Sequence, residues 1–186
     1  WKYLLLLEIL KLIQFAFPDC ENERVNLFID ALKECNLLPT EDIVHTAKHL
    51  NTTNISLNFK DIITIGKETE REYILSGTDE ITDAGFGILK DAYFGDNYFY
   101  IIIDGLDDAL RGKQFSSDII TGLIRAADTI NNTLRFTIHL KIIILLRSDI
   151  FELCRDPDLT KIKRDSTINL TWTKEDLQNI VIKRIQ

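Results

Sequence analysis

The sequence has little proline, little cysteine and no methionine. Its 186 residues include three prolines and three cysteines. With so few prolines, no proline-rich linker divides the chain, so we expect a single domain over residues 1–186. Cys20, Cys35 and Cys154 are odd in number, lie far apart and form no C-x-x-C pair, which excludes a disulfide framework and a zinc-binding pattern. A reducing cytoplasm is the simplest setting. The first residue is Trp1 rather than methionine, so we expect a piece of a longer protein.

The sequence also lacks an uninterrupted apolar run of membrane-spanning length. Residues 1–17, WKYLLLLEILKLIQFAF, are the most apolar stretch, but Lys2, Glu8, Lys11 and Gln14 interrupt it. The stretch is shorter than the ~20 apolar residues that a spanning helix needs. Residues 15–20, FAFPDC, at the end of this stretch make a poor signal-peptide cleavage site. We therefore predict a buried helix and no membrane partner.

Positive charge is scarce as well. The chain has 22 lysines and arginines against 29 aspartates and glutamates, a formal net charge of -7. An acidic surface repels the phosphate backbone, so the charge does not support a nucleic-acid partner. The short basic stretch KIKRD, residues 161–165, is more typical of a solvated face.

Apolar residues are plentiful and recur at helical spacing in the first half of the chain. They make up 45% of the sequence, enough for a sizeable core. Val25, Phe28, Ile29, Leu32 and Cys35 fall on one face of a predicted helix. The helices predicted in this half cover residues 1–16, 21–38, 40–50 (capped by Thr40) and 78–95, and residues 54–68 are predicted as a strand or hairpin.

In the second half, solid apolar runs alternate with amphipathic helices. The runs are YFYIII (98–103), TIHLKIIILL (137–146) and the shorter DSTINLTW (165–172), and the helices are residues 116–134 and 173–185. Solid runs are typical of strands buried on both faces of a parallel sheet. The pattern predicts an α/β three-layer sandwich with a helical N-terminal part. We expect Trp172 to pack in the core or between domains.

Charged residues stand directly after the first two of these strands. Asp104, Asp107 and Asp108 follow the first, and Arg147 and Asp149 follow the second. Ligands of open parallel sheets bind at the carboxyl ends of the strands, so these side chains are expected at one edge. An ordinary Asp-Gly turn explains Asp104, and a helix cap is the simplest role of Asp149. Three clustered acids are better explained by a cation such as Mg²⁺ held together with a polyphosphate.

The stretch YFYIIIDGLDD resembles the Walker B strand of P-loop NTPases. More narrowly, it is similar to the extended Walker B of the bacterial STAND and KAP-like ATPases. Several later features support this resemblance, which covers roughly residues 95–186: a strand followed by RSDIF, then a strand with LTW, then a helix with DL and KRI. The resemblance implies a parallel sheet of the ASCE type of P-loop NTPase.

The same resemblance assigns roles to four residues. It implies that Asp104 holds Mg²⁺ through water, and that Asp107 or Asp108 orients or activates the attacking water. Arg147 becomes the sensor-1 residue that contacts the γ-phosphate of ATP, a task suited to a guanidinium fork. The implied cofactors are therefore Mg²⁺ and ATP.

A phosphate loop, G-x-x-x-x-G-K-[ST], is missing from the sequence. Gly105 and Gly112 are separated by six residues instead of four, and Gly66-Lys67 is followed by Glu68 instead of a hydroxyl residue. In the family the loop lies on an upstream strand, so we expect an incomplete sheet and a chain that is inactive by itself.

Two functions of different classes follow. The first is an ATP-binding and hydrolysing switch module of a larger bacterial protein, as in anti-phage defence, which forms homo-oligomers or has attached effector or sensor domains. The second is a degenerate NTPase fold that acts as a non-catalytic scaffold. His45 and His49 have zinc-like spacing but no further ligands at a suitable distance in sequence, so a surface role is favoured. The Walker B and sensor-1 assignment predicts that the strands before Asp104 and Arg147 run parallel in one sheet, either adjacent or separated only by the phosphate-loop strand. Adjacency is favoured, and both side chains are expected at one edge, facing a common cleft.

Overall fold

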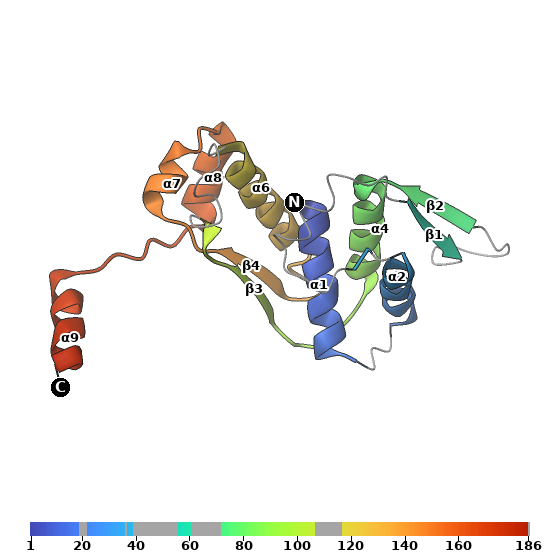
Figure 1. Cartoon of the computed structure of the whole chain (residues 1–186), viewed down its shortest axis with the longest axis horizontal. Coiled ribbons are helices and arrows are strands. Elements are labelled where there is room, and N and C mark those ends of the chain that lie inside the picture. The colour runs from blue at the N-terminus through green and yellow to red at the C-terminus, as the bar shows by residue number, and fades with distance from the viewer. Residues whose placement is uncertain (19–21, 36, 39–55, 61–71, 107–116, 186) are drawn as a thin grey trace. The chain divides into compact units, whose positions relative to one another are not determined.

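The chain folds into two compact units, Trp1–Cys154 and Arg155–Gln186. The computed structural model describes residues 1–18, 22–35, 37–38, 56–60, 72–106 and 117–185. The first unit contains, in chain order, α1 (Lys2–Ala16), α2 (Glu23–Glu34), β1 (Ser56–Lys60), β2 (Glu72–Ser76), α4 (Thr78–Asp91), β3 (Phe99–Ile103), α6 (Ser117–Thr133), β4 (Leu140–Ile144) and α7 (Ser148–Leu153) (Figure 1). The second contains α8 (Pro157–Ser166) and α9 (Lys174–Ile185). The described chain is mixed α/β and mostly helical, which agrees with the predicted α/β class at this level.

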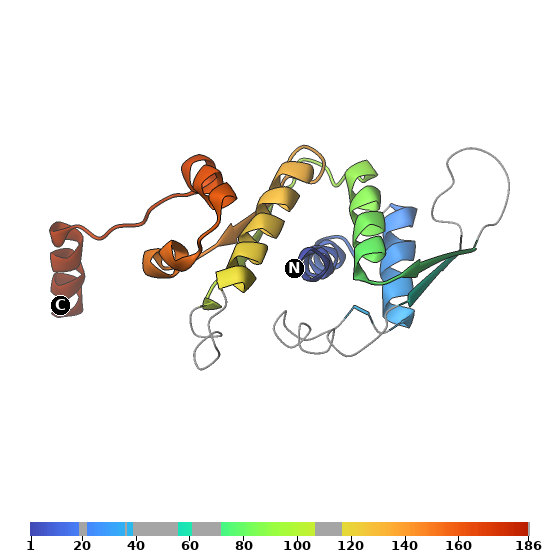
Figure 2. The same cartoon turned by 90° about the horizontal axis from the view of Figure 1, so that it is seen from above.

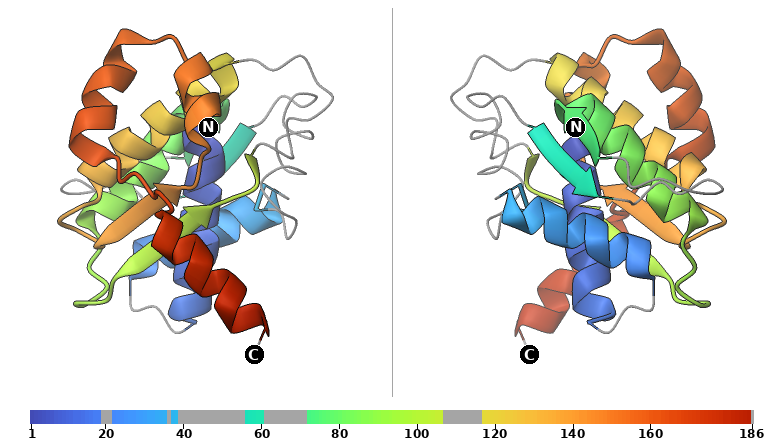
Figure 3. Two further views of the ribbon diagram at one scale, coloured as in Figure 1. Left: turned by 90° about the vertical axis from the view of Figure 1, so that its left-hand side faces the viewer. Right: turned by 90° about the vertical axis from the view of Figure 1, so that its right-hand side faces the viewer.

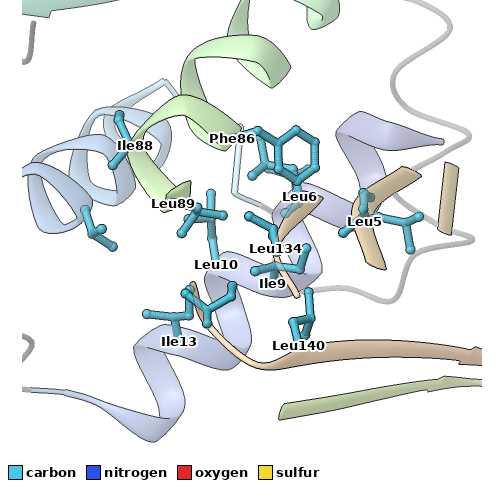
Figure 4. Close-up of a cluster of buried hydrophobic side chains, with 14 of the residues drawn as sticks. Leu5, Leu6, Ile9, Leu10, Ile13, Phe86, Ile88, Leu89, Leu134 and Leu140 are labelled. Atoms are coloured by element: carbon cyan, nitrogen blue, oxygen red, sulfur yellow. The ribbon is translucent and has the colours of Figure 1, made fainter. Parts of the chain in front are cut away.

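Helix α1 is the central element of the first unit. Figure 2 looks along α1 and shows it between α6 and α4, both of which it contacts. Leucine and isoleucine occupy nearly every side of this helix, so it has to be covered from several directions. Its buried residues are Tyr3, Leu4, Leu5, Leu6, Leu7, Ile9, Leu10 and Ile13. Figure 4 shows Leu6, Ile9 and Leu10 packed with side chains of α4 and with Leu134 and Leu140. The predicted buried helix is confirmed.

Helix α2 and the β1–β2 hairpin lie beside α4. Val25, Phe28, Ile29 and Leu32 of α2 are buried as predicted, whereas Cys35 is exposed because the helix ends at Glu34. The strands β1 and β2 pair antiparallel, from Ser56↔Ser76 to Lys60↔Glu72, and contact α2 and α4 (Figure 3). The strand predicted within residues 54–68 is therefore confirmed by β1, and its partner comes later in the sequence.

The strands β3 and β4 form a parallel pair in register from Phe99↔Leu140 to Ile103↔Ile144. Helix α6 packs on β4 (Figure 1). On the covered face Phe99, Leu140 and Ile142 are buried, whereas on the other face Tyr100 is 58% and Ile102 62% exposed. Within the described chain these strands are therefore covered on one face, whereas the sequence predicted burial on both faces. A solid apolar run fixes which residues prefer burial, but a second layer has to be present to cover them.

The third predicted strand, residues 165–172, is not a strand. Its first two residues end α8, and residues 167–173 have no regular structure. The alternating Ile168, Leu170 and Trp172 suit a strand, but a strand also needs a neighbour for its backbone hydrogen bonds. Trp172 is 70% exposed and so does not pack in the core of its own unit, and its predicted role between domains stays a prediction.

The helix predicted at residues 173–185 is confirmed as α9, and so is its capping box. The Asp176 carboxylate accepts from the Thr173 N–H at 2.9 Å, and the Asp176 N–H donates to the Thr173 hydroxyl at 3.1 Å. The helix predicted at residues 40–50, with His45 and His49, lies outside the described residues. Among the helices that are described, none has the length and apolar character to cross a bilayer.

Two glycines of α4 provide a matched test of core packing. A Cβ on Gly85 would lie 2.5 Å from Leu6 Cδ2 and 3.0 Å from the Phe28 ring, whereas a Cβ on Gly87 would meet nothing within 4 Å. We expect Gly85→Ala to lower the free energy of unfolding by about 1–3 kcal/mol through overpacking. Gly87→Ala should raise it by about 0.5–1 kcal/mol, because alanine is the better helix former. Urea denaturation of the two variants measures both effects, and equal shifts would contradict this packing.

Burial of the Tyr3 hydroxyl in α1 predicts that the protein loses stability at alkaline pH. Its hydroxyl is buried without a hydrogen-bond partner among the described residues, and burial raises its pKa to about 12. An unfolded tyrosine has a pKa near 10, so between about pH 10 and 12 only the unfolded chain loses this proton and stability falls as the pH rises. We expect Tyr3→Phe to gain about 1 kcal/mol at neutral pH and to lose less stability over this alkaline window. Urea titrations at pH 8 and at about pH 11 compare the two proteins.

Candidate functional site

The candidate site lies at the carboxyl ends of β3 and β4. The two strands are adjacent and parallel, as predicted, and the Leu145 N–H donates to the Ile103 carbonyl at 2.8 Å just past the paired residues. Asp104 follows Ile103 directly, and Arg147 stands two residues after Leu145. Since the carboxyl ends of parallel strands meet at one edge, Asp104 and Arg147 leave the sheet at the same edge. The predicted parallel and adjacent arrangement of the two strands is confirmed, and the common cleft stays a prediction.

Asp104 begins a tight turn. Its Oδ1 accepts a hydrogen bond at 2.7 Å from the N–H of Gly105, which has φ +71°. Glycine adopts this left-handed conformation without the steric cost of a Cβ. The exposed carboxylate is therefore a turn former in this structure. An exposed carboxylate at a sheet edge is also the kind of group that holds a hydrated Mg²⁺, so the two roles are compatible.

Asp107 and Asp108 lie outside the described residues. Within the described part of the chain, no three histidine, cysteine, aspartate or glutamate side chains gather closely enough to hold a metal ion. The cluster of three acids predicted after β3 therefore stays a prediction, with only Asp104 placed.

Arg147 is held by a neighbouring carboxylate. It occupies the N-cap position of α7, and its Nε and Nη2 donate to the two carboxylate oxygens of Asp149 at 3.1 and 2.8 Å. The hydrogen bond from Arg147 lowers the pKa of the Asp149 carboxyl below its usual value. Both side chains are well exposed, so the pair adds little to stability, but its fork geometry orients the guanidinium.

The capping role predicted for Asp149 is wrong. The N-cap of α7 is Arg147, and Asp149 lies in the first turn of the helix. An acid in the first turn still interacts favourably with the helix dipole, which explains its placement. The Asp149 carboxylate binds the Arg147 guanidinium and also interacts with the backbone N–H groups of Asp149 and Ile150 in this first turn.

Comparison of the chain with family models, with curated proteins and with solved structures found no match. The chemistry at this edge is therefore assessed from its own residues. One exposed carboxylate and one exposed guanidinium stand after neighbouring parallel strands, which suits a ligand that bears both a cation and an anion.

Two structural features near the site were missed at the sequence level. One is the uncovered face of the sheet, where the exposed Tyr100 and Ile102 of β3 alternate with the buried Phe99 and the partly buried Ile101 and Ile103. The other is Asn131 in α6, whose side chain binds the backbone of Ile142 in β4. The alternation of tyrosines in YFYIII was a signal for the first. No sequence pattern indicated the second, because residues 131 and 142 meet only after the helix folds back on the strand.

Two substitutions of Asp104 separate its turn role from its charge. Asp104→Ala removes the acceptor for the Gly105 N–H and should lower the free energy of unfolding by about 0.5–1.5 kcal/mol. Asp104→Asn keeps an oxygen at the same place and should stay within about 0.5 kcal/mol of the wild type. Chemical denaturation of both variants measures the difference. An equal loss in the two would show that the charge, rather than the hydrogen bond, stabilises the turn.

Proposed function

We propose that this chain contains the Walker B and sensor-1 region of an ATP-binding and hydrolysing switch module of the STAND/KAP-like kind. The observation behind the proposal is that Asp104 and Arg147 follow two adjacent parallel strands and so leave the sheet at the same edge. Phosphoryl transfer requires positioning and charge compensation more than covalent chemistry, and these two side chains offer both signs of charge. The module belongs to a larger bacterial protein, for example one that acts in anti-phage defence as a homo-oligomer or with attached effector or sensor domains.

In this proposal Asp104 holds the hydrated Mg²⁺ that accompanies ATP. The ion would supply charge compensation for the β- and γ-phosphates. The turn hydrogen bond from Gly105 to Oδ1 fixes the carboxylate at the end of β3, so the side chain is oriented before any ligand arrives. Asp107 and Asp108 are proposed to position the attacking water.

Arg147 is proposed to bind the γ-phosphate. Its guanidinium makes a two-pronged contact with Asp149, the same geometry that a phosphate oxygen pair would take. Binding of the phosphate therefore exchanges one anionic partner of Arg147 for another, and Asp149 holds the guanidinium until then. Because the Asp149 carboxylate is exposed, releasing it into water costs little.

We also propose that β3 and β4 belong to a larger parallel sheet within a three-layer P-loop sandwich. Parallel sheets normally have both faces covered, whereas here the face with Tyr100 and Ile102 is exposed. A layer over this face and further strands beside the pair would complete the architecture. A phosphate loop on one of those strands is needed for tight ATP binding, since the present sequence lacks one.

The test uses the protein encoded by the full gene and follows Mg²⁺-dependent ATP hydrolysis. We expect Asp104→Asn to reduce turnover by roughly 100-fold or more, because it removes the charge and preserves the turn. Asp96→Asn is the matched control, since Asp96 is exposed and precedes β3, at the opposite end of the strand. Turnover of Asp104→Asn equal to that of the control would rule out the Mg²⁺ role.

The alternative is a non-catalytic scaffold with a degenerate NTPase fold. Two observations favour it: the sequence has no phosphate loop, and Asp104 and Arg147 each have a local protein partner. The coding sequence upstream of Trp1 discriminates between the two functions. A glycine-rich loop that ends in Gly-Lys-Ser or Gly-Lys-Thr supports the ATPase, and its absence from the whole gene supports the scaffold.

A further inference from the structure

The outer edge of β4 has backbone groups that point away from β3. In a parallel pair, alternate residues of each strand face the partner. The His139 carbonyl accepts from the Phe99 N–H at 3.2 Å, and the Leu145 N–H donates to Ile103, so the odd-numbered residues of β4 face β3. The N–H and C=O groups of Leu140, Ile142 and Ile144 consequently face outward. Among the described residues no further strand pairs with this edge.

One of these outward-facing residues has a side-chain partner. The Ile142 N–H donates to Asn131 Oδ1 at 2.7 Å, and Asn131 Nδ2 donates to the Ile142 carbonyl at 3.0 Å. Only one orientation of the amide satisfies both bonds, since the N–H requires an acceptor and the carbonyl a donor. The carboxamide of Asn131 thus makes the same two bonds that the N–H and C=O of one residue in an antiparallel neighbouring strand would make.

Strand β4 is also complementary to itself. If two copies pair antiparallel about a two-fold axis at Ile142, that residue pairs with its own copy and Leu140 lies opposite Ile144. The one charged residue, Lys141, then lies opposite Ile143, so no like charges oppose each other. Such a strand edge pairs readily with a second copy unless something covers it.

We propose that Asn131 is an edge guard, which prevents β4 from pairing with β4 of a second copy of this chain. Its amide hydrogen-bonds the N–H and C=O of Ile142, the middle one of the three outward-facing residues. The antiparallel pairing cannot form while the Asn131 side chain occupies these groups. The inference rests on the β4 edge alone, and it implies that the further strands proposed for the sheet pair with the other edge of β3, because Asn131 occupies the outer edge of β4.

The experiment compares the molar mass of wild type, Asn131→Ala and Asn132→Ala by light scattering across a dilution series. Asn132 is the matched control, because it is the next residue in α6, is exposed and bonds Asp128 instead of the strand. We expect Asn131→Ala to dimerise with a dissociation constant at least about tenfold lower than the other two proteins, since truncation leaves the Ile142 groups unpaired. Equal dissociation constants for the three proteins would overturn the proposal.

Amide hydrogen exchange shows whether the outer edge of β4 is the dimer contact. It also tests the role of Asn131 in the wild type, so the proposal can be tested even if Asn131→Ala does not fold. In the wild type, the Ile142 amide should exchange at least about tenfold more slowly than the outward-facing amides of Leu140 and Ile144. In the Asn131→Ala dimer, all three amides should be protected. If the Ile142 amide of the wild type exchanges as fast as the amides of Leu140 and Ile144, Asn131 does not protect the edge and the proposal is overturned. A variant dimer in which Leu140 and Ile144 stay unprotected would place the contact elsewhere and also overturn the proposal.

Discussion

Burial of helix α1 on nearly all sides is the constraint on which the first unit depends. A helix with leucine and isoleucine around most of its circumference cannot lie on a surface, so several elements have to pack against it. Helices α4 and α6 do so from different sides, and α4 in turn contacts α2 and the β1–β2 hairpin. The close approach of α4 depends on Gly85, because no side chain fits between this residue, Leu6 and Phe28.

The parallel pair β3–β4 is joined to this assembly through one face only. Helix α6 packs on β4, and the covered face of the strand pair belongs to the same core as α1. The other face displays Tyr100 and Ile102, which an isolated domain would rarely leave in water. The same pair has an outer edge whose middle residue is satisfied by Asn131. The sheet is therefore secured on one side and, in the described chain, uncovered on the other.

The candidate site is built on the same pair of strands and combines local with longer-range order. Local contacts orient the charged groups: Gly105 binds the Asp104 carboxylate, and Asp149 binds the Arg147 guanidinium. The longer-range element is the parallel register of β3 and β4, which puts both groups at one edge. Neither contact needs a ligand, so the arrangement suits either a switch awaiting nucleotide or a scaffold that has lost it.

The sequence by itself determined the elements whose signals are local. The apolar helix α1, the amphipathic face of α2, the capping box of Thr173 and Asp176, and the strands before Asp104 and Arg147 all follow from spacing and composition. Only the tertiary structure decided what depends on a partner. Residues 167–172 have strand-like alternation yet form no strand, since backbone pairing needs a neighbour, and β3 is covered on one face, since burial needs a second layer. The contact of Asn131 with Ile142 likewise depends on tertiary structure, because the two residues meet only after α6 folds back on β4. Periodicity records which residues favour burial, whereas contacts between elements determine what covers them.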